Sequence, residues 1–261
     1  MHLPRTVLNA IKAVYPRFGL RDSDVLLASY PKSGNTWVRF IWANMISLME
    51  MDGRKIDFKI INTEMVAEYD SHSYGSLEFE TLPRFVKTHK RYMPAAFGGN
   101  RCVYIVRHPG DVLVSYFEYR KAQKNIRETA SDLGEFIRNE EHGMSAWCNH
   151  VSDWVPNSDA ILRYEDLKSD AVVAIERTLR KIGIDSVPEK VVDEAVERSS
   201  FDSMKRAEEK RGRLREGRFE SGYEFMRKGA TGEWKERLKK PDVEYLKRKV
   251  SKHNVEVKYS L

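Results

Sequence analysis

The chain has 261 residues, of which 41% are hydrophobic and 11% aromatic, which is enough to bury a sizeable core in one domain. Its net charge is +6. Residues 205–218 contribute +4 of this charge, because they carry seven basic and three acidic side chains. This composition argues against a disordered chain, and the two cysteines exclude a disulfide-rich scaffold. Its longest apolar stretch, Phe40 to Met51, is interrupted by Asn44, Ser47 and Glu50 and is too short to span a bilayer.

The first predicted elements form a strand, a glycine turn and a helix. Asp24 to Tyr30 is a short apolar run between polar residues, which predicts a buried strand that ends at Pro31. Lys32 to Asn35 forms the turn, and a helix begins at Thr36. Its apolar residues recur every three or four positions, at Trp37, Ile41, Met45 and Leu48.

The rest of the chain alternates between predicted strands and helices. The polar residues 52–80 predict loops with short helical pieces. Further elements follow in chain order: strands at Arg84–His89 and Arg101–Val106, a helix from Pro109 through Tyr119, a helical region near 129–155, a strand at Asp159–Tyr164, and helices near 169–182 and 188–198. This alternation predicts an α/β fold, with one domain over residues 1–261 and a central, mainly parallel sheet flanked by helices.

The turn at Lys32 to Asn35 has the chemistry of an anion cradle. A glycine turn that leads into a helix directs several backbone N–H groups at one point, and the helix dipole favours negative charge there. Lys32 adds a full positive charge. A Walker motif places its lysine after the second glycine, whereas Lys32 precedes Gly34. The segment therefore predicts a phosphate or sulfate cradle, with an ordinary tight turn as the open alternative.

Three segments resemble those of the cytosolic sulfotransferases that use 3′-phosphoadenosine 5′-phosphosulfate (PAPS). The segment Tyr30 to Trp37 is similar to the family's 5′-phosphosulfate loop, with Asn35 at a position where threonine is more common. The segment Tyr104 to Tyr116 is similar to its 3′-phosphate segment, in which an arginine and a serine eight positions later bind the phosphate. The triplet Lys87-Thr88-His89 matches the family's Lys-Thr-His, whose histidine is the catalytic base.

Three later segments continue the resemblance in the same order along the chain. Arg163 to Leu167 resembles a segment whose tyrosine contacts adenine, and Ser199 to Lys205 resembles the Ser-Phe-x-x-Met lining of the adenine pocket. Phe225 to Lys235 resembles the Arg-Lys-Gly-x-x-Gly-x-Trp-Lys signature that holds the 3′-phosphate. The similarity thus spans residues 25–235 in six ordered segments.

The resemblance implies a P-loop-kinase-like sulfotransferase fold and in-line transfer of a sulfuryl group from PAPS to a hydroxyl or amine. It implies that His89 is the general base and that Lys32, Lys87 and Ser115 are also catalytic. The implied cofactor-binding residues are Lys32, Ser33, Gly34, Asn35, Thr36, Trp37, Arg107, Ser115, Tyr164, Ser199, Phe201, Met204, Phe225, Met226, Arg227, Lys228 and Gly229.

The expected partner is a small-molecule acceptor, with no metal, no nucleic acid and no stable membrane insertion. Because Cys102 and Cys148 form no CxxC pair, we expect a reducing, cytoplasmic location. The basic residues 205–218 are interpreted as a lid over the cofactor. Two alternatives stay open here: a P-loop-type small-molecule kinase, and a non-catalytic module that binds a polyanion through this basic segment. The acceptor and the oligomeric state are not determined by the sequence.

Overall fold

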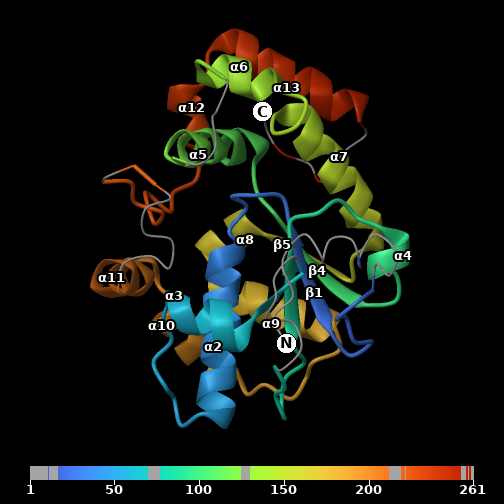
Figure 1. Cartoon of the computed structure of the whole chain (residues 1–261), viewed down its shortest axis with the longest axis vertical. Coiled ribbons are helices and arrows are strands. Elements are labelled where there is room, and N and C mark those ends of the chain that lie inside the picture. The colour runs from blue at the N-terminus through green and yellow to red at the C-terminus, as the bar shows by residue number, and fades with distance from the viewer. Residues whose placement is uncertain are drawn as a thin grey trace.

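The structure is a computed structural model that describes residues 11, 17–69, 77–124, 130–211, 219–220, 222–253, 257 and 259 (Figure 1). Its centre is a five-stranded, all-parallel sheet in the order β2-β3-β1-β4-β5. The strands are β1 (Val25–Ser29), β2 (Ala67–Glu68), β3 (Phe85–Thr88), β4 (Arg101–Val106) and β5 (Ala160–Arg163).

The order of the strands determines where a site can form. The central strand β1 pairs with β3 on one side and with β4 on the other. The chain therefore builds the β2–β3 half first and then crosses to the β4–β5 half. In open parallel sheets, ligands bind at the carboxyl ends of the strands where the strand order reverses. The residues that follow β1, β3 and β4 meet at this position.

Helices cover both faces of the sheet. They are α2 (Asn35–Glu50), α3 (Phe58–Ile60), α4 (Pro94–Phe97), α5 (Pro109–Lys121), α6 (Leu133–Arg138), α7 (Met144–Trp154), α8 (Tyr164–Ser169), α9 (Ala171–Lys181), α10 (Glu189–Arg198), α11 (Phe201–Arg211), α12 (Trp234–Arg237) and α13 (Lys240–Lys252), with the π-helical turn η1 (Ile61–Met65) and the 3₁₀ turn η2 (Val155–Asn157).

The alternation of side chains along β1 separates two apolar cores. Val25 and Leu27 pack in the core beneath α2, α9 and α10, while Leu26 and Ala28 pack in the core beneath α5, α6, α7 and α13. Figure 1 shows these two sets of helices on different sides of the sheet. Because both faces of the strand are buried, β1 is apolar throughout rather than alternating, as parallel strands require.

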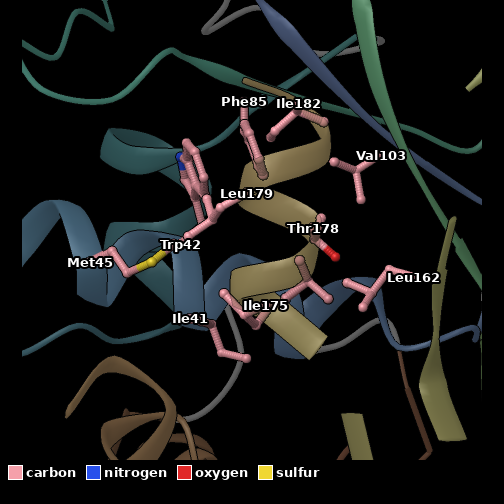
Figure 2. Close-up of a pocket in the computed structure, with 11 residues that line it drawn as sticks. Ile41, Trp42, Met45, Phe85, Val103, Leu162, Ile175, Thr178, Leu179 and Ile182 are labelled. Carbon is pink, nitrogen blue, oxygen red and sulfur yellow. The ribbon is translucent and has the colours of Figure 1, made fainter. Parts of the chain in front are cut away.

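The core beneath α2 and α9 is closely packed. Figure 2 shows a small cavity in it of about 10 Å³, which is no larger than the space that one water molecule needs. The rings of Trp42 and Phe85 stack beside it with centroids 3.4 Å apart. Thr178, a polar residue of the lining, donates its hydroxyl to the Ala174 carbonyl at 2.8 Å. This cavity is a packing feature and not a ligand site.

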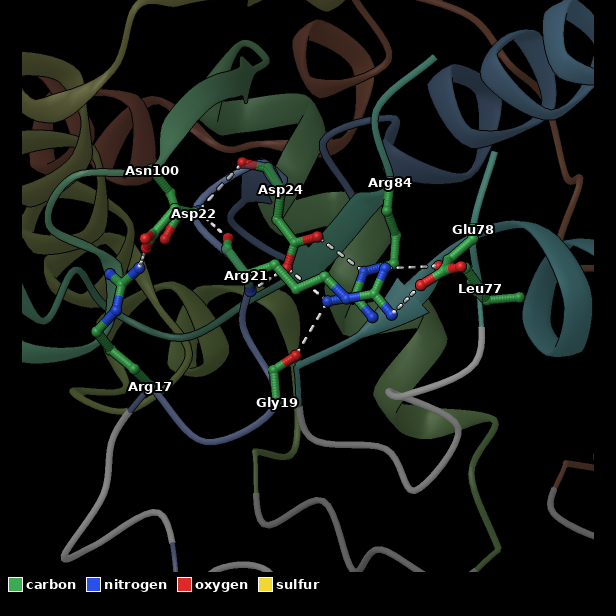
Figure 3. A network of polar contacts seen from close by, with 9 residues as sticks. All are labelled: Arg17, Gly19, Arg21, Asp22, Asp24, Leu77, Glu78, Arg84 and Asn100. Carbon is green, nitrogen blue, oxygen red and sulfur yellow. Dashed lines mark hydrogen bonds and ion pairs between the residues drawn. The ribbon is translucent and has the colours of Figure 1, made fainter. Parts of the chain in front are cut away.

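A buried ion pair joins the amino ends of β1 and β3, at the edge opposite the site (Figure 3). Arg84 donates from Nε to Asp24 Oδ1 at 2.8 Å and from its terminal nitrogen to Oδ2 at 2.6 Å. The same guanidinium also donates to the Gly19 carbonyl at 3.0 Å. Asn100, before β4, donates to the Arg21 carbonyl at 2.7 Å. These bonds hold the starts of three strands in position.

The structure agrees with most elements expected from the sequence and differs at a few. Strand β4 has the predicted bounds, and β1, β3 and β5 are each shorter than predicted by one residue at both ends. Residues 52–80 do contain the short helical pieces α3 and η1, but also the unpredicted strand β2. The helical region near 129–155 is divided into α6 and α7, and helices α8 and α13 were not predicted. The predicted lid begins as helix α11, and residues 212–218 lie outside the described residues.

Candidate active site

Four segments meet at the carboxyl edge of the sheet, and Arg107 joins three of them. Arg107 follows β4 and is buried. Its guanidinium donates to the Lys32 carbonyl at 3.2 Å and to the Ala230 carbonyl at 2.8 Å, and it lies 4.4 Å from the ring centre of Tyr164. The turn after β1, the end of β5 and the carboxyl-terminal segment are thus gathered around one cation.

The turn after β1 has the backbone geometry of an anion site. Lys32 and Gly34 both have left-handed backbone, with φ of 69° and 103°. A side chain at Gly34 would place its Cβ 2.5 Å from the ring of Tyr164, so glycine is required on two grounds. Within the described part of the chain, no side chain caps the amino end of α2. The hydroxyl of Ser33 is buried and has no hydrogen-bond partner among the described residues. These unsatisfied donors and the helix dipole favour an anion.

The ammonium group of Lys32 lies between two aromatic rings. Its Nζ is 3.9 Å from the ring centre of Phe225 and 4.7 Å from that of Tyr119. Cation–π contacts of this kind orient a cation without neutralising it. Phe225 is itself anchored to α11, because the backbone N–H groups of Phe225 and Met226 donate to the Glu208 carboxylate at 3.0 Å each.

His89 follows β3 and is held in one tautomer. Its Nδ1 lies 2.7 Å from the carbonyl oxygen of Ser29 and 3.2 Å from the Ser29 hydroxyl. A carbonyl can only accept, so Nδ1 carries the hydrogen and Nε2 keeps its lone pair. Burial and the nearby Lys87 ammonium lower the pKa of His89 to about 3. The imidazole is therefore neutral near pH 7 and can take up a proton.

Lys87 is paired with a carboxylate that the sequence did not indicate. Lys87 and Glu68 are direct neighbours in the register of β3 and β2, and Lys87 Nζ lies 2.9 Å from Glu68 Oε1. Burial alone would raise the pKa of Glu68, but the charge and hydrogen bond of Lys87 lower it to about 2. Arg39 and His89 also lie within electrostatic reach of this carboxylate.

The cations of the carboxyl-terminal segment gather around Glu233. Arg227 donates to both of its carboxylate oxygens, at 2.7 and 2.5 Å, and Lys228 Nζ lies 3.2 Å from Oε1. Gly229 has φ of 58°, and a Cβ there would lie 2.5 Å from the ring of Phe201. The predicted Arg-Lys-Gly segment and the Ser-Phe-x-x-Met segment are therefore in direct contact.

The other predicted cofactor-binding residues differ in the contacts that they make. The rings of Trp37 and Tyr164 meet edge to face with centroids 5.8 Å apart. The Asn35 amide is turned inward and donates to the Leu27 carbonyl at 3.3 Å and to the Ser29 hydroxyl at 3.2 Å. The Ser199 hydroxyl donates to the Ala195 carbonyl and accepts from Asn44. Met204 is buried, and Thr36 and Ser115 lie half-buried on α2 and α5.

Comparisons with known proteins bear on this arrangement. The family model described as the sulfotransferase domain matches residues 22–255. The chain is 30% identical over 233 residues to Sulfotransferase 1 family member D1 of Rattus norvegicus, covering 84% of this chain and 79% of that protein. It is also 30% identical over 239 residues to Sulfotransferase 1B1 of Canis lupus familiaris, with coverage of 84% and 79%.

The chain belongs to the sulfotransferase domain family.

Solved structures share the fold of this sulfotransferase. Retinol dehydratase in a complex with retinol and PAP matches with a TM-score of 0.72 at 21% identity, covering 98% of this chain and 88% of that one. Retinol dehydratase in complex with androsterone and the inactive cofactor PAP gives 0.71 at 19% identity, with coverage of 97% and 87%. The predicted fold class and the predicted reaction class, sulfuryl transfer, are confirmed, and they hold over the kinase and binding-module alternatives.

Several residues of the sulfotransferase site escaped the sequence analysis. Asp111 lies in the first turn of α5 and accepts hydrogen bonds from the backbone of Gly232 at 2.8 Å and Trp234 at 3.1 Å. A carboxylate in the first turn of a helix was a readable signal for an anchoring role. Glu68, Tyr119 and Glu208 lie far in sequence from the groups that they contact, so no local pattern revealed them. Glu233 lies only six residues from Arg227, but nothing in the sequence indicated that the two side chains pair.

Two features are absent from the described residues of the sulfotransferase. No helix in that part of the chain is long and apolar enough to cross a bilayer. Within the same residues, no group of three or more His, Cys, Asp or Glu side chains is placed to hold a metal ion.

Proposed function

We propose that His89 is the general base for sulfuryl transfer from PAPS, the donor used by this enzyme, to a hydroxyl or amine of a small apolar acceptor. The observation that carries this role is the 2.7 Å contact between His89 Nδ1 and the Ser29 carbonyl. That contact leaves Nε2 unprotonated at the carboxyl edge of β3. The base therefore stands beside the turn that is built to receive an anion, which is the juxtaposition that sulfuryl transfer needs.

The hydrogen-bond donors and cations of the site fit the sulfate, the 5′-phosphate and the 3′-phosphate of PAPS. The Ser33 hydroxyl, which has no partner among the described residues, and the backbone N–H groups at the start of α2, which no described side chain caps, are assigned to the phosphosulfate. Because the amide of Asn35 is used within the protein, we assign only its backbone N–H to the donor. Arg107, Arg227 and Lys228 supply the charge for the 3′-phosphate, with arginine offering the planar fork that phosphate prefers.

Four side chains then have separate roles in one displacement at sulfur. His89 Nε2 accepts the acceptor proton as the acceptor oxygen or nitrogen bonds to sulfur. The bond from sulfur to the 5′-phosphate oxygen breaks, and its electron pair stays on that oxygen. Lys32 stabilises this developing negative charge. Lys87, held by Glu68, faces the same region and helps to hold the sulfuryl oxygens, while Ser115 is assigned to the 3′-phosphate side.

Aromatic side chains support an apolar acceptor. The rings of Tyr30 and Tyr116 meet edge to face with centroids 5.9 Å apart, and the Tyr30 hydroxyl donates to the His142 carbonyl at 2.8 Å. The ring of Tyr119 lies next to the ring of Tyr116 and to the Lys32 ammonium, so the aromatic side chains extend toward Lys32. Retinol and androsterone, which are apolar ring compounds, occur in the retinol dehydratase structures. We also place the enzyme in the cytoplasm, which the free, buried thiols of Cys102 and Cys148 support.

The test is transfer from radiolabelled PAPS to pooled phenols, alcohols and amines. The wild type is expected to label at least one acceptor pool. The His89→Ala variant should lose transfer but retain calorimetric affinity for adenosine 3′,5′-bisphosphate. His253→Ala, at the end of α13, removes a remote histidine and should leave transfer unchanged. Full transfer by His89→Ala would refute the assigned role of His89.

A further inference from the structure

The carboxylate of Glu233 is surrounded by cations. Arg227 contacts both of its oxygens, at 2.7 and 2.5 Å, Lys228 lies at 3.2 Å, and Arg237 lies at 3.6 Å. The Glu233 side chain is only 7% exposed. The hydrogen bond from Arg227 lowers the pKa of this carboxyl, so it stays charged near pH 7. A largely buried carboxylate that is charged near pH 7 thus occupies two cations that are assigned to the 3′-phosphate.

The backbone on both sides of Glu233 is anchored. Gly232 and Trp234 donate their N–H groups to the two oxygens of Asp111 in the first turn of α5. Trp234 is buried and stacks on His108, with ring centroids 4.7 Å apart. The backbone that carries the Glu233 carboxylate is therefore held in place at the start of α12. Its partners are the longer and more exposed side chains, 30% for Arg227 and 53% for Lys228.

A phosphate and this carboxylate require the same donors. The guanidinium fork binds a carboxylate or a phosphate in the same two-point geometry, so Arg227 cannot offer that face to both. A phosphate monoester carries nearly two negative charges near neutral pH, whereas Glu233 carries one. The 3′-phosphate can therefore bind Arg227 and Lys228, but only if it displaces the Glu233 carboxylate from them. It then lies next to this carboxylate, which carries a charge of the same sign.

We propose that Glu233 is an internal competitor for the 3′-phosphate, and that it limits the affinity of the enzyme for nucleotides that carry this group. The inference rests on the proposed assignment of Arg227 and Lys228 to the 3′-phosphate. Part of the interaction with this phosphate is offset by breaking the contacts of Glu233. The product adenosine 3′,5′-bisphosphate therefore leaves faster than it would from a site without this carboxylate, and product release limits turnover in many enzymes.

The variant Glu233→Gln isolates this effect. Glutamine keeps the size and one acceptor oxygen of the side chain but removes its charge. We expect this variant to bind adenosine 3′,5′-bisphosphate about tenfold more tightly, because the cations are no longer neutralised within the protein. Adenosine 5′-monophosphate, which lacks the 3′-phosphate, should bind with unchanged affinity. In single-turnover and steady-state assays, the release of bisphosphate should be slower.

Two controls accompany the calorimetry. Glu236→Gln removes an equal charge three residues away at an exposed position of α12, and should change neither affinity. Glu233→Asp keeps the charge and should bind both nucleotides about as the wild type does. Unchanged or weaker binding of the bisphosphate by Glu233→Gln overturns the proposal, as does equal tightening of both nucleotides. Unchanged monophosphate binding also reports that the variant is folded.

The affinities of the wild type for the two nucleotides distinguish a failure of this inference from a failure of the proposed function on which it rests. If Arg227 and Lys228 hold the 3′-phosphate, the wild type binds the bisphosphate much more tightly than the monophosphate. Equal affinities for the two nucleotides would overturn the 3′-phosphate assignment itself. A clear preference for the bisphosphate, combined with no tightening in Glu233→Gln, would overturn only the competitor role of Glu233.

Discussion

The pH dependence of transfer tests the electrostatic design around His89. Burial and Lys87 together lower the pKa of His89 from its ordinary 6.5 to about 3. A general base works only when it is neutral, so activity persists above its pKa and is lost as the pH falls through it. The wild type should therefore keep its acceptor kcat/KM nearly constant from pH 8 down to about pH 5. An unperturbed histidine would lose about tenfold at one pH unit below 6.5.

The variant Lys87→Met perturbs this arrangement in a known direction. Removing the ammonium removes the second cause of the lowered pKa and leaves Glu68 unpaired beside His89, and both changes favour the imidazolium. Burial, the larger cause, remains, as do the nearby Arg39 and His150. We expect the acid limb of kcat/KM to move upward by one pH unit or more, equivalent to about 1.4 kcal/mol per unit. The maximal rate should also fall if Lys87 helps to hold the sulfuryl oxygens, as we propose.

The assay uses saturating PAPS and an aliphatic alcohol acceptor, which does not itself titrate between pH 4 and pH 9. Glu68→Gln serves as the opposite perturbation, since it removes a negative charge and should move the acid limb further down. A wild-type acid limb near pH 6.5 would contradict the burial of His89. Superimposable profiles for the wild type and Lys87→Met would show that the ammonium does not act on the imidazole.

Two further predictions concern stability and the position of Lys32. Asp24→Asn removes the charge of the fully buried carboxylate that pairs with the 3% exposed Arg84 side chain, and should lower the free energy of unfolding by about 3–5 kcal/mol in urea denaturation. Asp22→Asn is its matched control, because Asp22 is 99% exposed and its loss should cost under about 1 kcal/mol; equal losses would contradict the role of burial. Phe225→Leu removes the ring 3.9 Å from the Lys32 ammonium and should reduce kcat by about tenfold, while Phe225→Tyr keeps the ring and most of the rate. A rate for Phe225→Leu equal to that of the wild type would show that the ring does not position Lys32.

Local sequence patterns determined the framework and the family. Short apolar runs bounded by polar residues indicated β1, β3, β4 and β5, because a strand covered on both faces must be apolar along its whole length. The turn at Lys32 to Gly34 was readable because left-handed backbone and a helix start leave a clear glycine signal. Motifs in a fixed order then indicated sulfuryl transfer, since each is a short, contiguous run of residues that can be read without the fold.

Only the tertiary structure decided how the side chains of the site are paired. Strand β2 has two residues and exists only because β3 lies beside it, so Glu68 could not be assigned to Lys87 from the sequence. The inward bonds of Asn35 were equally hidden. The pairing of Arg227 with Glu233, only six residues later, was hidden as well, because it depends on how the turn between them is folded. Sequence patterns report backbone geometry and burial, which are local properties. The partner of a charge depends on which distant segments the fold brings within about 3 Å, and no local pattern records that distance.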